Sequence, residues 1–314
     1  MKALVTGAAG FIGSRIAARL DHDGHAVIGL DDLSEGKREN LDDAPGVVLV
    51  EADLRDADAV ARVAGGCDVI FHQGAKRSVP RSLLEPVLTT EVNVGGTVNV
   101  LLAARAAGAR VVWASSSSVY GDQDTTPQHE GMVPAPKSPY AASKLAGEAY
   151  ARAWWESLGV PTVSLRYFNV YGPRQDPMSE YSAVVPRFIV ACLTRSRPTI
   201  YGDGEQARDF TYIDDVVQAN IRAAGAPEEA FGCAFNVGGG ETPTSINGLL
   251  SIVAELTGVD PDPIREPARP GDMRYTEADM TETQRVIGHR PAIGMREGLA
   301  RTVEWFREHV EVTA

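Results

Sequence analysis

The fold is decided by Thr6-Gly7-Ala8-Ala9-Gly10-Phe11-Ile12-Gly13, which joins a strand-like segment (1–5) to a helical pattern (14–20). The spacing G-x-x-G-x-x-G suits a turn in which the backbone approaches a pyrophosphate and the helix packs closely on the strand. Free N–H groups at the helix start, aided by the helix dipole, would face the phosphates. The stretch therefore predicts a dinucleotide-binding turn, with these cofactor contacts: Gly7, Gly10, Phe11, Ile12 and Gly13.

A second strand-like stretch, 26–30, ends at Asp31 and is followed by Asp32 and Ser34. Dinucleotide folds place an acid at this point, where it binds the adenosine ribose hydroxyls. An acid here would repel the extra phosphate of NADP, so the sequence predicts NAD as the cofactor. The alternative interpretation is a glycine-rich turn followed by a solvated acid.

Bulk composition excludes several classes. The 314 residues carry a formal net charge of −12 with no basic stripe, so no nucleic-acid partner is expected. No apolar run is judged long enough to span a membrane, and no secretory leader is seen. Three distant cysteines (Cys67, Cys192, Cys233) favour a reducing, cytoplasmic setting. The six histidines lack metal-ligand spacing, so no metal site is expected.

The first half of the chain alternates short apolar strands with helical patterns. We expect strands at 47–50, 69–71, 111–114 and 162–166, and helices at 86–107 and 138–158. Short apolar strands between helices predict an α/β fold with a doubly wound parallel Rossmann sheet.

The pattern becomes irregular and richer in proline and glycine from about residue 169. A helix at 213–224 and a strand at 234–237 then return to the sheet. We therefore expect an NAD-binding Rossmann domain of residues 1–168 plus 211–237. Residues 169–210 plus 238–314 are expected to form a smaller α/β cap domain that binds the substrate.

Two polar segments, 114–121 and 138–144, follow later strands at the carboxyl edge where such folds bind ligands. Tyr140 and Lys144 are four residues apart and so share a helix face. A free tyrosine has a pKa of about 10, and a nearby ammonium lowers that pKa by favouring the phenolate. The pair predicts an acid/base that takes a proton from an alcohol as hydride leaves its carbon. The alternative is a solvated pair.

Taken in order, Thr6–Gly13, Ser116, Tyr140 and Lys144 resemble the extended short-chain dehydrogenase/reductase family, over almost the whole chain. Within it, residues 166–177 (RYFNVYGPRQDP) and 201–210 (YGDGEQARDF) resemble the nucleotide-sugar 4-epimerases. The run through Arg-Gln-Asp-Pro, with 181–186 after it, is most similar to the bacterial UDP-N-acetylglucosamine (UDP-glucose) 4-epimerases.

The resemblance implies roles for further residues. Ser116 would be the catalytic hydroxyl beside Tyr140 and Lys144. Further cofactor contacts would be Asp31, Asp32 and Ser34 after the second strand, Asp53 and Leu54 at the adenine, Gly74 and Ala75 at the pyrophosphate or nicotinamide ribose, Asn93 supporting the central helix, Phe168 at the nicotinamide, and Tyr140 and Lys144 themselves. The UDP-sugar would be bound by Ser78, Ser116, Ser117, Asn169, Arg187, Tyr201, Arg208, Arg269, Asp272 and Thr276.

Arginine gives planar, charge-assisted bonds to phosphate, which suits Arg208 and Arg269; surface ion pairs are the alternative for both. The resemblance also implies a homodimer through helices near 86–107 and 140–158.

The expected reaction depends on a missing acid. Dehydratases and decarboxylases of the family resemble T-D-E-x-Y-G or T-S-E-x-Y-G after the serine-rich strand, whereas this chain has no carboxylate at Ser117-Ser118. The sequence thus favours a 4-epimerase working through a transient 4-keto sugar. A net NAD(P)-dependent oxidoreductase or dehydratase, and an NAD-binding sensor without turnover, are the alternatives.

The sequence does not determine which sugar the UDP-sugar substrate carries. The resemblance implies that a small residue at the position of Thr276 leaves room for a 2-acetamido group, so UDP-GlcNAc/UDP-GalNAc and UDP-Glc/UDP-Gal are both permitted. Lys76 and Arg77 would meet a sugar carboxylate in a UDP-glucuronic acid 4-epimerase. They would otherwise contact cofactor phosphate or solvent.

Overall fold

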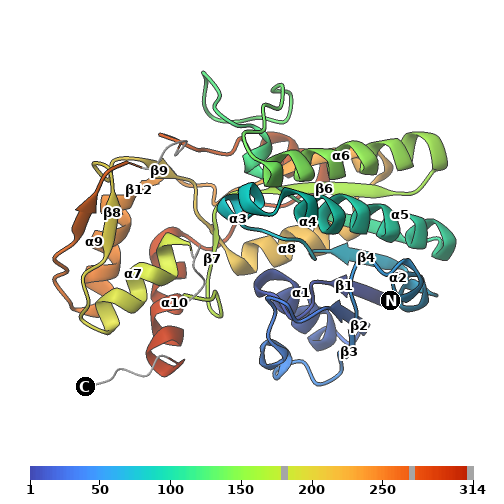
Figure 1. The fold of residues 1–314 in the computed structure, drawn as a ribbon, viewed down its shortest axis with the longest axis horizontal. Helices are drawn as coiled ribbons and strands as arrows, with labels where there is room; N and C mark the ends of the chain where they lie inside the picture. Colours follow the sequence, from blue (N-terminus) through green and yellow to red (C-terminus); the bar gives the residue numbers. More distant parts are fainter. Residues whose placement is uncertain (178–182, 269–272, 310–314) are drawn as a thin grey trace.

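A seven-stranded, fully parallel sheet forms the centre of the computed structural model, which describes residues 1–177, 183–268 and 273–309. Its strand order is β11-β6-β5-β4-β1-β2-β3 (Figure 1). The bounds are β1 (Lys2–Thr6), β2 (Ala26–Asp31), β3 (Val48–Glu51), β4 (Val69–His72), β5 (Arg110–Ser116), β6 (Thr162–Tyr167) and β11 (Cys233–Val237). This order confirms the predicted doubly wound α/β fold.

Helices cover both faces of this sheet, so its central strands are buried on both sides. One face carries α1 (Phe11–His22) and α8 (Ile213–Ala224). The other carries α2 (Ala57–Ala64), α5 (Gly96–Ala107) and α6 (Pro139–Leu158) (Figure 1). Every residue of β4 and β6 is buried. That explains why these strands appear in the sequence as short runs with little polar alternation.

The predicted helix at 86–107 is present and contains a π-helical turn. It consists of α4 (Pro86–Thr90), a π-helical turn η2 (Glu91–Gly95) and α5. Asn93 in this turn bonds the backbone of Lys76 in both directions (Lys76 N to Oδ1, 2.7 Å; Nδ2 to Lys76 O, 3.0 Å) and Ser143 Oγ (2.9 Å). These tertiary contacts, which periodicity does not reveal, accompany the wide turn.

The sequence-based statement about membrane spans needs correction. Residues 86–107 are long and apolar enough to cross a membrane by length and composition. Half of that stretch is buried inside the protein, where α5 packs against α2 and α6. We therefore interpret it as a core helix of the layer that covers the sheet.

A second core lies beside the sheet, at the left of Figure 1. It is built around α7 (Val184–Leu193), α9 (Ile246–Thr257) and α10 (Met295–His309). Three two-stranded pairs accompany them: β7 (Val170–Tyr171) with β10 (Thr211–Tyr212), β8 (Thr199–Tyr201) with β13 (Ile264–Glu266), and β9 (Ala207–Arg208) with β12 (Thr244–Ser245). The residue bounds of the two predicted domains stay a prediction.

The remaining short elements were not predicted. They are α3 (Val79–Leu84), η1 (Arg38–Leu41), η3 (Ser117–Val119), η4 (Glu228–Ala230) and η5 (Thr283–Ile287). Of these, α3 and η3 border the site described below. Short segments of three to six residues give too little periodicity to be recognised in a sequence.

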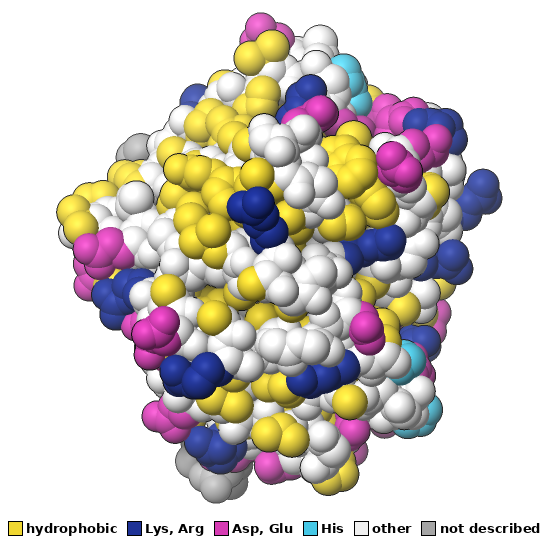
Figure 2. Space-filling view, turned by 90° about the vertical axis from the view of Figure 1, so that its right-hand side faces the viewer, with side chains coloured by type: hydrophobic (Ala, Val, Ile, Leu, Met, Phe, Trp, Pro, Cys, Tyr) yellow, Lys and Arg dark blue, Asp and Glu magenta, His cyan; other side chains and the backbone are white. Residues whose placement is uncertain are grey.

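Figure 2 shows the surface at the right-hand end of Figure 1. Hydrophobic side chains gather in its upper half, whereas Lys and Arg are interspersed with Asp and Glu over the rest. This face thus carries no basic stripe of the kind that nucleic acid requires. The three cysteines are free, with Cys67 and Cys192 buried and Cys233 exposed.

Candidate active site

The glycine turn between β1 and α1 requires glycine at two positions. Gly7 has a φ of +65°, and a Cβ there would lie 2.7 Å from the backbone nitrogen of Gly74. A Cβ on Gly13 would lie 2.7 Å from the carbonyl carbon of Gly7. The turn after β1 and the turn after β4 thus touch at the point where the strand order reverses. Open α/β sheets bind their ligands at this crevice.

The start of α1 is arranged for an anion. Gly10 is its N-cap residue, and Ser14 N gives the first intrahelical bond to Gly10 O at 3.0 Å. The amides of Phe11, Ile12 and Gly13 therefore have no acceptor within the helix. All three residues line the crevice, so their N–H groups fit a pyrophosphate.

Asp31 ends β2 at the same crevice. Its Oδ2 accepts from Ala9 N (2.9 Å) and its Oδ1 from Leu33 N (2.8 Å). Burial raises the pKa of this carboxyl, while the two backbone hydrogen bonds lower it. These bonds fix the direction of the carboxylate and leave lone pairs for ribose hydroxyls. The glycine cradle, the helix start and this acid together fit NAD.

The cofactor crevice contains nearly all of the predicted cofactor residues. Besides those already described, it is lined by Asp32, Ser34, Asp53, Leu54, Gly74, Ala75, Tyr140 and Lys144. Two predicted residues do not line it. The side chain of Asn93 ties the segment after β4 to α6. Phe168 is buried in a small cluster with Val119 and Tyr120.

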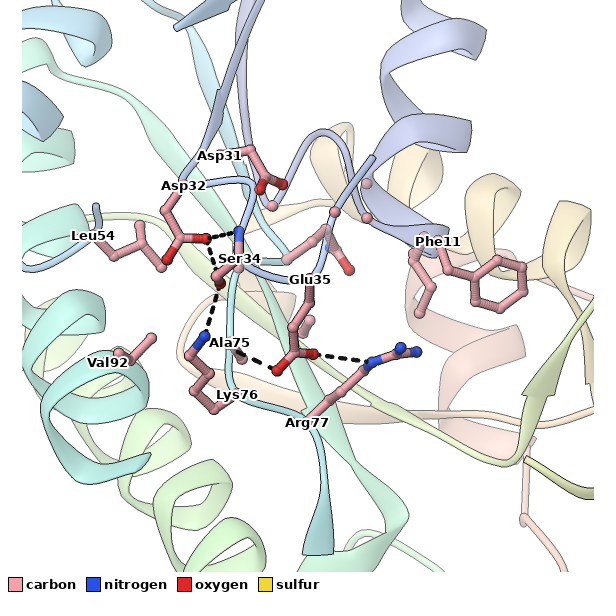
Figure 3. Close-up of a pocket in the computed structure, with 18 of the residues that line it drawn as sticks. Phe11, Asp31, Asp32, Ser34, Glu35, Leu54, Ala75, Lys76, Arg77 and Val92 are labelled. Carbon is pink, nitrogen blue, oxygen red and sulfur yellow. Dashed lines mark hydrogen bonds and ion pairs between the residues drawn. The ribbon is translucent and has the colours of Figure 1, made fainter. Parts of the chain in front are cut away.

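The sequence left three possible partners for Lys76 and Arg77: a sugar carboxylate, cofactor phosphate or solvent. In the structure both side chains face Glu35 across the crevice (Figure 3). Lys76 Nζ donates to Ser34 Oγ (2.8 Å) and lies 3.9 Å from Glu35 Oε1. Arg77 Nε lies 3.4 Å from Glu35 Oε2, and Arg81 NH1 lies 3.3 Å from Glu35 Oε1. We call Glu35, Lys76, Arg77 and Arg81 the Glu35 cluster; it links the loop after β2 to the segment after β4.

Ser116, Tyr140 and Lys144 come together where β5 ends and α6 begins. Burial raises the pKa of Tyr140, whereas the nearby Ser116 hydroxyl and the charge of Arg77 lower it. Lys144 Nζ lies 5.9 Å from the centre of the Tyr140 ring and donates to Ala114 O at 2.7 Å. Burial lowers the pKa of Lys144 to about 7, against the opposing charge of Glu148.

Ser118 and Ser82, which hold this set in place, were not predicted from the sequence. Ser116 Oγ accepts from both the amide (3.2 Å) and the hydroxyl (2.9 Å) of Ser118, which leaves its own proton to donate. Ser82 on α3 accepts from the backbone N–H of Tyr140 at 3.1 Å. The serine-rich run hinted at Ser118, but nothing local in the sequence indicated Ser82.

A buried ion pair lies one turn beyond Lys144. Glu148 accepts two bonds from Arg166 (Oε1 from Nε, 2.9 Å; Oε2 from NH2, 2.7 Å) and a third from the Ser115 hydroxyl. The guanidinium of Arg166 also lies 4.7 Å from the centre of the Tyr120 ring. This pair joins α6, β5 and β6 beneath the site.

A second pocket lies between the sheet and the smaller core. Of the predicted substrate residues, Asn169, Arg187, Tyr201 and Arg208 line it. Ser78, Ser116, Ser117 and Thr276 do not line it: Ser78 Oγ caps α3, and Thr276 is buried with its Oγ1 3.4 Å from Asn169 Nδ2. Arg269 and Asp272 lie outside the described residues. No cluster of candidate metal ligands occurs in the described part of the chain.

A dinucleotide crevice that ends in a serine, tyrosine and lysine defines an NAD-dependent enzyme of the short-chain dehydrogenase/reductase type. Residues 3–238 match the NAD dependent epimerase/dehydratase family, and the chain belongs to that family.

The chain is 44% identical to a UDP-glucose 4-epimerase of Mycolicibacterium smegmatis, covering 98% of this chain and 99% of the relative. Among solved structures it is similar to a UDP-N-acetylglucosamine 4-epimerase from Methanobrevibacter ruminantium M1 in complex with UDP-N-acetylmuramic acid (38% identity, TM-score 0.93, 98% and 99% of the chains). It is also similar to the UDP-glucose 4-epimerase of Thermus thermophilus in complex with NAD (40%, 0.90, 99% and 100%). These relatives are isomerases that differ in the named sugar.

Proposed function

We propose that this protein is an NAD-dependent 4-epimerase of a UDP-sugar with a neutral hexose or N-acetylhexosamine. The observation that carries the proposal is the set of Ser116, Tyr140 and Lys144 beside a strand end that offers only hydroxyls, at Ser117 and Ser118. Elimination or decarboxylation requires additional proton transfers, and no acid stands at this strand end to perform them. Oxidation and reduction at one carbon need only the tyrosine.

The chain's own groups supply the proton path. Tyr140, as a phenolate favoured by the Lys144 ammonium, accepts the proton of the sugar 4-hydroxyl, and Ser116 donates to the same oxygen. NAD bound in the crevice supplies a group that takes up the hydride and returns it. After the 4-keto sugar has turned its other face, Tyr140 gives the proton back to the oxygen. Enzyme and cofactor are thus regenerated in each turnover.

The Glu35 cluster supports a neutral sugar. Lys76 and Arg77 line the cofactor crevice, while neither lines the second pocket. Both lie within 4 Å of the Glu35 carboxylate, on the cofactor side (Figure 3). A uronate would need a cation directed at the sugar, because burying an unpaired carboxylate is costly. Thr276 does not discriminate between a hydroxyl and an acetamido group here, since it is buried behind Asn169.

The test is a substrate panel without added cofactor. Purified protein is incubated with UDP-Glc, UDP-GlcNAc and UDP-GlcA, and the 4-epimers are separated by anion-exchange chromatography while absorbance at 340 nm is followed. We expect epimerisation of UDP-Glc, UDP-GlcNAc or both. In a parallel reaction with NAD⁺ added, product that forms only there and with one NADH for each product would indicate a net oxidoreductase in place of an epimerase. Preferred turnover of UDP-GlcA would contradict the proposal of a neutral sugar. Tyr140→Phe is the inactive control.

We also infer a homodimer formed through the face of α3, α4 and α6. Three apolar side chains there are largely exposed: Leu83 (62%), Leu84 (74%) and Val87 (69%). Exposed apolar groups that gather on neighbouring helices favour a protein contact. Sedimentation velocity should give a dimer that Leu84→Glu with Val87→Glu converts to a monomer; a wild-type monomer at micromolar concentration would contradict it.

A cytoplasmic location is the remaining proposal. It is supported by the three free, widely separated cysteines, since oxidising compartments favour paired ones. Fractionation of the native cells should find the protein with soluble cytoplasmic markers, and recovery with secreted proteins would refute it.

A further inference from the structure

The environment of the Lys144 ammonium contains a group that the proposed mechanism has not used, the indole of Trp113. Trp113 lies in β5 and is 1% exposed. Lys144 Nζ is 4.4 Å from the centre of the Trp113 ring, closer than to the Tyr140 ring. An ammonium this close to an indole face is attracted by the ring quadrupole, most strongly for tryptophan among the aromatic residues.

The helix that carries Lys144 is shaped to admit this indole. Gly147 lies on α6 one turn after Lys144, and a Cβ on it would stand 2.7 Å from Cε2 of Trp113. Any larger residue would push the ring away from its place against the helix. The indole Nε1 has no hydrogen-bond partner among the described residues. The ring therefore contributes through its face and its packing.

The neighbouring charged groups leave Lys144 without a carboxylate of its own. On α6, Glu148 is engaged by Arg166 of β6 through two hydrogen bonds. On β4, His72 lies 4.7 Å from the Trp113 ring, and burial together with the Lys144 charge lowers its pKa to about 3, so it stays neutral. Among the described residues, the partners of the ammonium are the Ala114 carbonyl and the faces of Trp113 and Tyr140.

We propose that Trp113 is a positioning residue that holds the Lys144 ammonium, in its charged form, beside Tyr140. The inference rests on the proposed acid/base role of Tyr140. Burial disfavours the charged form of Lys144, and the attraction of the indole face opposes that effect. Without the indole face the ammonium is less favoured. The phenolate of Tyr140 then loses its stabilising charge and the pKa of Tyr140 rises.

The test measures Tyr140 itself and so does not depend on turnover. The NAD-loaded protein is titrated with base, and the phenolate absorbance at 295 nm is taken as the difference between each variant and the same variant carrying Tyr140→Phe. We expect the midpoint to rise by about one pH unit in Trp113→Leu and by roughly half as much in Trp113→Phe. Trp154→Leu, which removes an indole carried by α6 itself, should leave it unchanged.

Equal midpoints in wild type, Trp113→Phe and Trp113→Leu would overturn the proposal. If Trp113→Leu does not fold, an unshifted Trp113→Phe is enough to overturn it. If the wild type is active, the positioning role further predicts that kcat of the Trp113 variants is high over a narrower range of pH than kcat of the wild type. The range should shrink at its acidic and at its basic end, with KM unchanged. A wild type that epimerises no UDP-sugar would refute the proposed function, while the titration would still decide the role of Trp113.

Discussion

Replacing Glu148 by Gln should destabilise the protein strongly, although the two side chains have the same shape. The side chains of Glu148 and Arg166 are 9% and 6% exposed, so the guanidinium would keep its charge with little access to water. Removing one partner of a buried pair costs about 3–5 kcal/mol. Arg166 retains its contact with the Tyr120 ring at 4.7 Å, so we expect the lower end, about 3 kcal/mol. Tm should fall by on the order of 6 °C.

The measurement is urea unfolding of the NAD-loaded protein followed by circular dichroism. A matched control is Glu297→Gln, which breaks a pair with Arg301 whose side chains are about half exposed (55% and 46%). That pair should contribute within about 0.5 kcal/mol. The double variant Glu148→Gln with Arg166→Met should regain part of the loss, because it removes the uncompensated charge. A single-variant loss below about 1 kcal/mol would refute the reasoning about this pair.

Three further outcomes are expected. Gly13→Ala should abolish retention of NAD during purification, because its Cβ would press on the Gly7 carbonyl; a normal ratio of absorbance at 260 and 280 nm would contradict this. Glu35→Gln should speed NAD release about fivefold, seen on dilution into charcoal, since the cations across the crevice lose their shared partner; an unchanged rate would mean the cluster does not hold the cofactor. His72 has a pKa of about 3 in the folded protein and 6.5 as its ordinary value. Between pH 6.5 and about 3, His72 is therefore protonated in the unfolded chain and neutral in the folded protein. The free energy of unfolding consequently falls on acidification by up to about 1.4 kcal/mol per pH unit. His72→Gln should lessen that slope in unfolding experiments from pH 6.5 to 4, and an identical slope would refute it.

The parts of the site that the sequence predicts are those coded within one turn or one loop. The glycines at 7, 10 and 13 and the Tyr140–Lys144 pair each lie within a few residues, so spacing alone conveys their geometry. Asp31 could be predicted because it stands at the end of the next strand-like stretch. Short apolar strands between helices were enough to predict the parallel sheet.

What the sequence could not show depends on contacts between distant segments. Glu35 is separated in the sequence by more than forty residues from the cations that it contacts, and Trp113 by 31 residues from Lys144. Their pairing exists only once the strands have been ordered. The π-helical turn could not be predicted for a related reason: the apolar run at 86–107 predicts the helix correctly, but the wider turn at Glu91–Gly95 is accompanied by side-chain bonds of Asn93 to distant segments.

The π-helical turn contains one residue more than a regular α-helical turn at the same place would contain. Deleting a single residue between Glu91 and Gly95 would allow a regular α-helix from Pro86 to Ala107 with both flanking segments still packed. The fold would survive, yet Asn93 would swing away from Lys76 and Ser143 and uncouple the segment after β4 from α6. In this protein, the length of a helix carries information about the geometry of the candidate site that its composition does not.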